Sequence, residues 1–279
     1  MKPAFLAAAL ALAPHFATAQ TAADTPAPGP DVELWRLDCG TIEVPDIDGF
    51  SDSFAYHGQS KTLTNSCYLI RHGRDYMLWD TGLPLAVKPD GSGPVPTPGR
   101  PLVDQLAEID VTPDEIGRVG ISHAHFDHMG QAAEFPAATL TIGAGDWDQL
   151  RSDKHDFGID AALAQPWLDG GTVDPVSGDR DVFGDGSVTM LAMPGHTHGE
   201  TALLVRLAQT GPVLLSGDVV HFSEQLANEG VPPFNVDRAD SLASMHRLES
   251  LIRGTGARLV IQHEATHVGR LPAFPGSAR

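Results

Sequence analysis

The sequence contains only two cysteines, few basic residues and no apolar run long enough to span a bilayer. Two cysteines are not a disulfide framework for a chain of 279 residues. We expect Cys39 and Cys67, both in apolar strand-like segments, to be buried thiols rather than a bonded pair. The 18 basic residues against 36 acidic ones give a net charge of −18, which disfavours nucleic acid and anionic membranes as partners. A neutral or weakly polar small molecule suits this composition better.

The N-terminus has the pattern of an export signal. Lys2 is followed by an unbroken apolar run at 4–13, and small residues at 17–19 match the site that a signal peptidase reads. We expect a signal peptide at 1–19, a flexible lead-in at 20–31 and one folded domain at 32–279. The mature protein is then expected in the periplasm or outside the cell, without stable insertion in a membrane.

Apolar segments bounded by turn residues predict several strands. The segment 32–44 is one, and the apolar runs at 65–70 and 76–82, with an HGRD turn between them, are typical of a hairpin. The segment 88–100 is rich in proline and glycine, so we expect a surface loop there. Further apolar runs towards the C-terminus have the length of strands.

The clearest helix is predicted at 237–253. Asp237 can cap its start, apolar residues recur on one face, and Gly254 is expected to end it. A short helical turn is also predicted to begin at Thr112, ahead of a strand. Strands with interspersed helices in one domain indicate an α/β layered fold.

The segment ISHAHFDHMG at 121–130 carries four side chains that bind metals. It follows an apolar run, and alternate residues of an extended chain point the same way, so His123 and His125 can bind one ion. Asp127 and His128, where the chain turns, can face a second ion. Imidazole and carboxylate together suit zinc and its first-row neighbours.

Three later segments each place a polar residue where an apolar strand runs into a turn. They carry His196 in MPGHTHG, Asp218 in LLSGDVVHF and His263 in VIQHEAT. None of these side chains suits a core. Seven potential ligands of this kind fit a centre with two metal ions.

In these residues the chain resembles the metallo-β-lactamase superfamily, from about residue 32 to its end. The HxHxDH motif is complete, and an Asp-Thr-Gly element at 80–82 matches one that buttresses the metal site. The resemblance implies an αβ/βα four-layer sandwich that binds two divalent metal ions, with zinc expected. The resemblance implies that one ion is held by His123, His125 and His196, and the other by Asp127, His128 and His263. It also implies that Asp218 bridges the two ions.

Within the superfamily the chain is most similar to the N-acyl homoserine lactonases, which act in quorum quenching. The similarity lies in the segment after Asp218, in Cys39-Gly and Cys67, and in the residues around Asp127. It implies hydrolysis of the lactone ring by a metal-bridging hydroxide, with Asp127 as the proton carrier. Related lactonases are often dimers, so a homodimer is a further expectation.

One departure from that family concerns His221, which stands where the lactonases often have a tyrosine. We consider it a candidate catalytic residue that stabilises the oxyanion, or alternatively a residue that only lines the pocket. His198 stands where relatives commonly have proline, and we expect it to be exposed or outside the ligand set. Phe126 and Phe222 are candidates for the substrate pocket because they neighbour ligands.

Other functions stay open at this point. The bridging aspartate disfavours a β-lactamase, since class B β-lactamases lack it. Hydrolysis of another ester, phosphate ester or thioester is compatible with the same metals. A metal-binding protein or sensor without enzymatic activity would need a degenerate site, whereas here all seven positions are filled.

Overall fold

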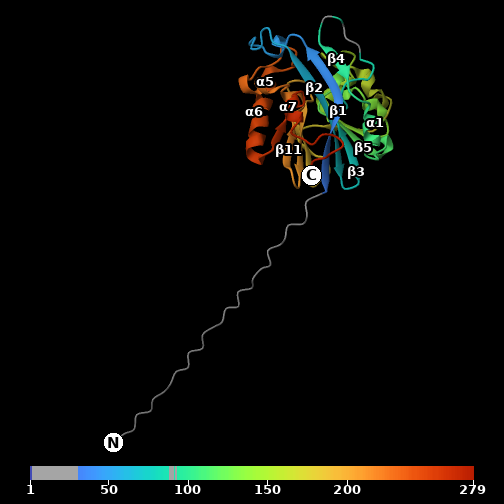
Figure 1. Ribbon diagram of the computed structural model, residues 1–279, viewed down its shortest axis with the longest axis vertical. Coiled ribbons are helices and arrows are strands. Elements are labelled where there is room, and N and C mark those ends of the chain that lie inside the picture. Colours follow the sequence, from blue (N-terminus) through green and yellow to red (C-terminus); the bar gives the residue numbers. More distant parts are fainter. Residues whose placement is uncertain (2–30, 88–90, 92) are drawn as a thin grey trace.

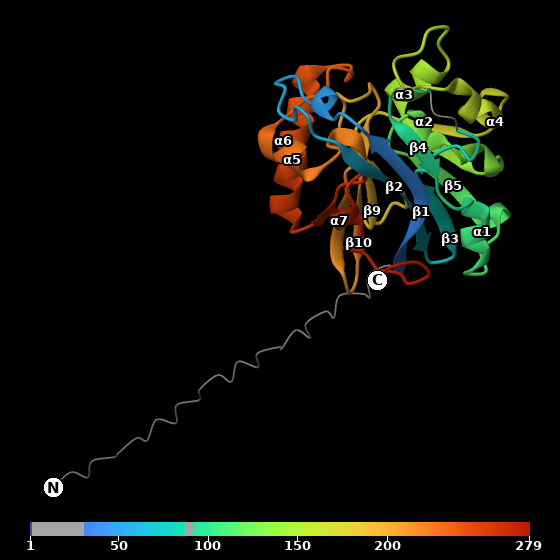
Figure 2. The same ribbon diagram turned by 45° about the horizontal axis from the view of Figure 1, so that its top comes forward.

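Two β-sheets pack face to face and carry helices on their outer faces (Figures 1 and 2). The computed structural model describes Met1 and residues 31–87, 91 and 93–279, so the predicted signal peptide after Met1 and nearly all of the predicted lead-in lie outside the described residues. Among the described residues, no helix has the length and apolar character needed to cross a membrane.

The first sheet has seven strands in the order β4-β1-β2-β3-β5-β6-β7. The predicted hairpin is confirmed, since β2 and β3 pair antiparallel, whereas β3, β5, β6 and β7 run parallel. The prediction of a surface loop at 88–100 is partly wrong, because β4 lies within this segment and pairs with β1. The strands are β1 (Val32–Val44), β2 (Lys61–His72), β3 (Asp75–Trp79), β4 (Val95–Pro98), β5 (Ile116–Ile121), β6 (Thr139–Gly143) and β7 (Val173–Val176).

The second sheet has five strands in the order β12-β11-β10-β9-β8. Strand β10 is antiparallel to both of its neighbours, and β11 and β12 are parallel, so β9, β11 and β12 all end at the same edge. The strands are β8 (Arg180–Asp181), β9 (Val188–Ala192), β10 (Thr201–Leu207), β11 (Gly211–Leu215) and β12 (Arg258–Val260).

The helices divide between the two outer faces, as Figure 2 shows with α1 to α4 on one side and α5 and α6 on the other. Helix α6 is capped by Asp237, whose side chain accepts from the N–H of Asp240, but it runs past Gly254 and ends at Gly256, the residue with a left-handed φ. The helices are α1 (Leu102–Ala107), α2 (Phe126–Met129), α3 (Ala144–Leu150), α4 (Gln165–Leu168), α5 (Ser223–Asn228), α6 (Arg238–Thr255) and α7 (Ala265–Val268), with 3-10 turns η1 (Asp48–Phe50), η2 (Pro113–Glu115), η3 (Ala132–Glu134), η4 (Ala161–Ala164) and η5 (Gly217–Val219).

The apolar core forms three layers that match this arrangement. In β2, Tyr68 and Ile70 point between the sheets, and Leu69 points to the outer layer under α1. On the far side, Met245 and Leu248 of α6 pack against the second sheet. Strands buried on both faces explain the near-continuous apolar runs in the sequence, and the layers confirm the predicted αβ/βα sandwich.

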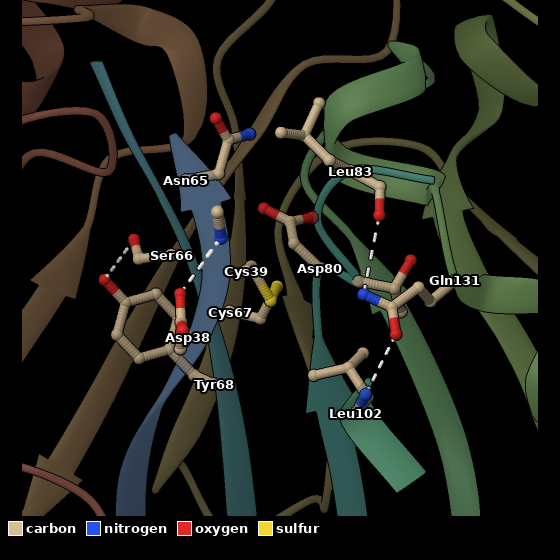
Figure 3. Close-up of a disulfide and its surroundings, with 12 residues drawn as sticks. Asp38, Cys39, Asn65, Ser66, Cys67, Tyr68, Asp80, Leu83, Leu102 and Gln131 are labelled. Atoms are coloured by element: carbon tan, nitrogen blue, oxygen red, sulfur yellow. Dashed lines mark hydrogen bonds between the residues drawn. A yellow bond between two sulfur atoms is a disulfide. The ribbon is translucent and has the colours of Figure 1, made fainter. Parts of the chain in front are cut away.

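The prediction of two free thiols is wrong, because Cys39 of β1 and Cys67 of β2 form a disulfide (Figure 3). Both residues are fully buried in the outer layer of the core. Cys67 lies opposite Leu37 in the strand register, and the ladder shifts just beyond Asp38. This irregularity in β1 brings Cys39 next to Cys67, with a Cα–Cα distance of 5.9 Å.

The disulfide supports the loop at 80–82. Gly82 has a left-handed φ of +64°, and a Cβ added there would lie 2.4 Å from the Cβ of Cys39. The N–H of the neighbouring Thr81 donates to the carbonyl of His128 at 2.7 Å. The contact between this loop and the disulfide therefore helps to fix the position of a predicted metal ligand.

Candidate metal centre

All seven predicted ligands lie at one end of the sandwich, where strands of both sheets end. Four of them, His123 to His128, follow β5, partly in the short helix α2. The others follow β9, β11 and β12, whose ends share an edge: His196, Asp218 and His263. All seven side chains are buried.

The first group consists of His123, His125 and His196, whose ligand atoms lie within 4.8 Å of one another. The Nε2 atom of His196 is 3.0 Å from Nδ1 of His125. The His123 Nε2 atom is 3.7 Å from an oxygen of Asp218. This is the set that the resemblance implies for one metal ion.

The second group consists of Asp127, His128 and His263, again within 4.8 Å. The Nε2 atoms of the two histidines are 3.3 Å apart, and each lies 3.6 to 3.7 Å from Oδ2 of Asp127. Asn65 on β2 donates to the backbone carbonyl and to Oδ2 of Asp127, at 2.9 and 3.1 Å. The carboxylate is therefore held towards the two imidazoles.

Asp218 lies between the two groups. Its Oδ2 atom is 3.5 Å from Nε2 of His196, and its Oδ1 atom is 3.4 and 3.1 Å from Nε2 of His128 and His263. The Oδ2 atom also lies 3.2 Å from Nε2 of His263. The carboxylate therefore contacts both groups, as a bridging ligand would.

The donor set fits metal ions. Among the described residues, Nε2 of His123 and Oδ1 of Asp218 are buried without a hydrogen-bond partner. Two nitrogens bound to one zinc ion at about 2.0–2.1 Å in tetrahedral geometry would be about 3.3 Å apart, close to the distances between these imidazoles. Buried donors at this spacing suit a cation shared between them.

Four of the histidines have their other ring nitrogen next to a polar partner. Such contacts fix the ring orientation and the tautomer of a metal ligand. The sequence pattern identified one of these partners, the aspartate of the Asp-Thr-Gly element, and missed the rest. The pairs are His123 with Glu200 at 3.1 Å, His128 with Asp80 at 3.0 Å, His196 with Asn235 at 2.8 Å and His263 with the carbonyl of Thr64 at 3.0 Å.

The side chain of Glu200 contacts one ligand histidine and the backbone of another ligand. One of its oxygens faces Nδ1 of His123, and the other accepts from the backbone N–H of Asp218 at 3.0 Å. Its side chain is fully buried, and burial, reinforced by the nearby Asp218 carboxylate, holds the pKa of Glu200 well above its ordinary value. Nearby positive charge is therefore needed to keep this carboxyl ionised.

The electrostatics of the two groups differ. Burial and neighbouring imidazoles hold the pKa of His123 and of His196 well below the ordinary value, so both are neutral. Burial also disfavours the charged form of His128, but nearby carboxylates, Asp218 first, outweigh it and raise its pKa well above the ordinary value. The pKa of His263 is raised by the same carboxylate despite burial.

Asp146 joins the two ligand loops of the first group. Its side chain accepts from the N–H of Ala124 at 2.8 Å, the hydroxyl of Thr197 at 2.9 Å and the N–H of Gly199 at 2.6 Å. Burial raises the pKa of Asp146 to about 6, although these hydrogen bonds oppose the shift. Because Ala124 lies between two ligands and Thr197 follows a third, this carboxyl holds both loops in register.

A cavity of about 480 Å³ opens above the two groups. Phe126 lines it, as the sequence suggested, but Phe222 does not, because it is fully buried behind Phe50 with ring centroids 5.7 Å apart. Phe157 and Phe234 complete the aromatic wall. No sequence signal distinguishes Phe157, which is a lone aromatic in a polar loop.

Two further histidines lie near the cavity. His198 is about half exposed and faces Asp156 at 3.3 Å, outside the two ligand groups. His221 is buried and lines the cavity, with Nε2 3.3 Å from Oδ2 of Asp218 and Nδ1 3.0 Å from Gln225. It therefore lies against the bridging carboxylate itself.

Comparisons with known proteins agree with this geometry. N-acyl homoserine lactonase AttM from Rhizobium johnstonii is 27% identical over 248 residues, covering 84% of this chain and 94% of the relative. An N-acyl homoserine lactonase from a Bacillus species is 26% identical over 220 residues, covering 75% and 84%.

Solved structures share the fold. An N-acyl homoserine lactone hydrolase with its product N-hexanoyl-L-homoserine at the catalytic metal centre has a TM-score of 0.75 at 23% identity, covering 88% of this chain and 98% of that one. The dizinc quorum-quenching lactonase AidC has a TM-score of 0.63 at 18% identity, covering 88% and 90%. The family model described as the metallo-beta-lactamase superfamily matches residues 61–263, which include all seven side chains of the two groups. The chain therefore belongs to the metallo-β-lactamase superfamily.

Proposed function

We propose that this chain binds two divalent metal ions, with zinc the expected metal, and hydrolyses N-acyl homoserine lactones. The observation that carries the proposal is the carboxylate of Asp218 between two groups of metal-binding side chains, directly below an apolar cavity. The lactonases that resemble the chain over most of its length support the substrate class.

In this proposal the first ion is held by His123, His125 and His196 and the second by Asp127, His128 and His263, with Asp218 bridging. When bound, two such ions supply a hydroxide at neutral pH by lowering the pKa of water to about 7, and they polarise the carbonyl group. The burial of these side chains strengthens these effects because little solvent screens them.

The protein's own residues bind the substrate and carry the proton. Asp127 lines the cavity and is oriented by Asn65, so it can take the proton from the nucleophile and return it to the leaving ring oxygen. The acyl chain is expected against the apolar wall that includes Phe126, Phe157 and Phe234. The lactone ring would then lie over the metal-binding groups.

We also propose that the protein is exported. The Cys39–Cys67 disulfide supports this, since disulfides persist in oxidising compartments and are rare in the cytosol. Export through the N-terminal pattern predicts a mature protein that begins near Gln20, which N-terminal sequencing of secreted material would detect. The homodimer stays a prediction, which light scattering would check.

The test of the catalytic proposal is ring opening of N-hexanoyl homoserine lactone, followed by pH-stat. We expect turnover that a chelator abolishes and added zinc restores. Asp218→Asn should lose it, and Asp148→Asn, an exposed aspartate on α3, should keep it. If protein shown to hold two metal ions opens no lactone, the proposal is wrong and other esters and thioesters become the candidates. Nitrocefin hydrolysis tests the β-lactamase alternative in the same preparation.

A further inference from the structure

His221 adds a third group of metal-binding atoms to the centre. It follows η5, three residues after Asp218, and its side chain is buried. The ligand atoms of His196, Asp218 and His221 lie within 4.8 Å of one another. The motif that defines the two other groups does not include this residue.

The proton on the His221 ring is fixed by Gln225. The backbone N–H of His221 donates to Oε1 of Gln225 at 2.7 Å, and Nε2 of Gln225 donates to the carbonyl of Gly230 at 3.0 Å. These two backbone groups determine which end of the amide is oxygen. The atom 3.0 Å from Nδ1 of His221 is therefore an acceptor, so Nδ1 carries the proton.

An imidazole that binds a metal ion does so through one ring nitrogen and keeps its proton on the other. With its proton on Nδ1, His221 presents Nε2 as the ligand atom, and this atom lies 3.3 Å from Oδ2 of Asp218. The spacing equals that of the His128 and His263 nitrogens, 3.3 Å apart in the second group.

We propose that His221 is a metal ligand through Nε2, and that it binds the same ion as His196 and Asp218. This rests on the proposed metal pair, and it gives His221 a role other than that of an oxyanion donor. A neutral donor would need its proton on Nε2, whereas Gln225 holds it on Nδ1. Imidazole nitrogen is a suitable ligand for zinc and its first-row neighbours.

The proposal makes the two metal positions unequal. His196 belongs both to the first group and to the set that contains His221 and Asp218. His221 therefore adds a ligand for the ion that His196 holds, and none of the sets that contain it includes Asp127, His128 or His263. We therefore expect the ion at His196 to be bound more tightly than the other.

The experiment measures zinc binding and not turnover. Full-length protein, His221→Phe, His221→Gln and the control His246→Gln, an exposed histidine paired with Glu229, are titrated against a competing chelator. Wild type and H246Q should bind two zinc ions. Both His221 variants should lose at least tenfold in affinity for one ion, since even outer-shell partners cost about 10–100-fold.

A second measurement uses the wild type and so does not depend on whether a His221 variant folds. Long-range ¹H–¹⁵N correlation of the zinc-loaded wild type should place the proton of His221 on Nδ1, with the shift of a metal-bound nitrogen at Nε2. A proton found on Nε2, or both variants binding two ions as tightly as H246Q, would overturn the proposal. Failure of the wild type to bind two ions would instead contradict the proposed metal pair, so the two failures are distinguishable.

Discussion

The contact between Gly82 and the disulfide gives the sharpest quantitative prediction. Gly82 and Gly73 have nearly the same backbone conformation, with φ of +64° and +60°. They differ in their surroundings, because a Cβ at Gly82 would meet the Cβ of Cys39 at 2.4 Å, whereas a Cβ at Gly73 would meet nothing within 4 Å. Comparing Gly82→Ala with Gly73→Ala therefore separates the steric cost from the backbone cost.

The magnitudes follow from these surroundings. A left-handed conformation costs a residue with a Cβ roughly 1–2 kcal/mol, and the loss of unfolded-state entropy returns about 0.4–1 kcal/mol. Both effects act alike in the two variants. Overpacking against a fixed core adds roughly 1–3 kcal/mol at Gly82 only. At about 2–4 °C per kcal/mol for a domain near this size, G82A should melt at least about 2 °C below G73A.

The assay is thermal unfolding of both variants and the wild type at one zinc concentration. G82A should also bind zinc less tightly, because the loop that moves carries Asp80, the partner of His128. G73A should bind zinc as the wild type does. Equal melting temperatures for the two variants would refute the reasoning, because the clash would then be relieved at no cost.

Three further predictions concern separate parts of the molecule. Glu200→Gln should lower zinc affinity by about tenfold or more in a chelator competition, because an amide has one acceptor oxygen for two N–H groups; unchanged affinity would contradict it. The double variant Cys39→Ala/Cys67→Ala should lose about 3.6 kcal/mol of unfolding free energy, as expected for a sequence separation of 28 residues; identical urea midpoints would count against this. Phe157→Ala should raise KM for long-chain lactones more than for short-chain ones and leave kcat unchanged. Phe54→Ala is the control, because both side chains are exposed but only Phe157 lines the cavity.

The fold and the two ligand groups could be predicted because their signals are local in the sequence. Four of the seven residues lie directly after one apolar strand, within residues 123–128. The other three, His196, Asp218 and His263, each follow another such strand. Strands that end at the same edge bring the residues that follow them together. Order and position along the chain therefore predict that the seven residues come together, whereas their division between two ions came from the resemblance to the metallo-β-lactamase superfamily.

What the sequence could not supply are contacts between residues far apart in the chain. Glu200 and Asp146 are single acidic residues among 36, and no spacing distinguishes them from solvent-exposed ones. The disulfide depends on an irregularity in β1, which alters the register and leaves no mark in composition. Phe222 faces the core and Phe157 the cavity because of backbone turns that hydrophobicity does not encode.

The charges of the carboxylates at the site bear on the proposed function. Two ligand carboxylates, Asp127 and Asp218, and two carboxylates beside ligand histidines, Asp80 and Glu200, carry four negative charges in a buried region. Buried charge is costly unless it is paired. Two divalent ions supply four positive charges, which offset most of the negative charge of these carboxylates and of the proposed hydroxide. Imidazole at His221 adds a ligand without adding negative charge, whereas a carboxylate in its place would add one more.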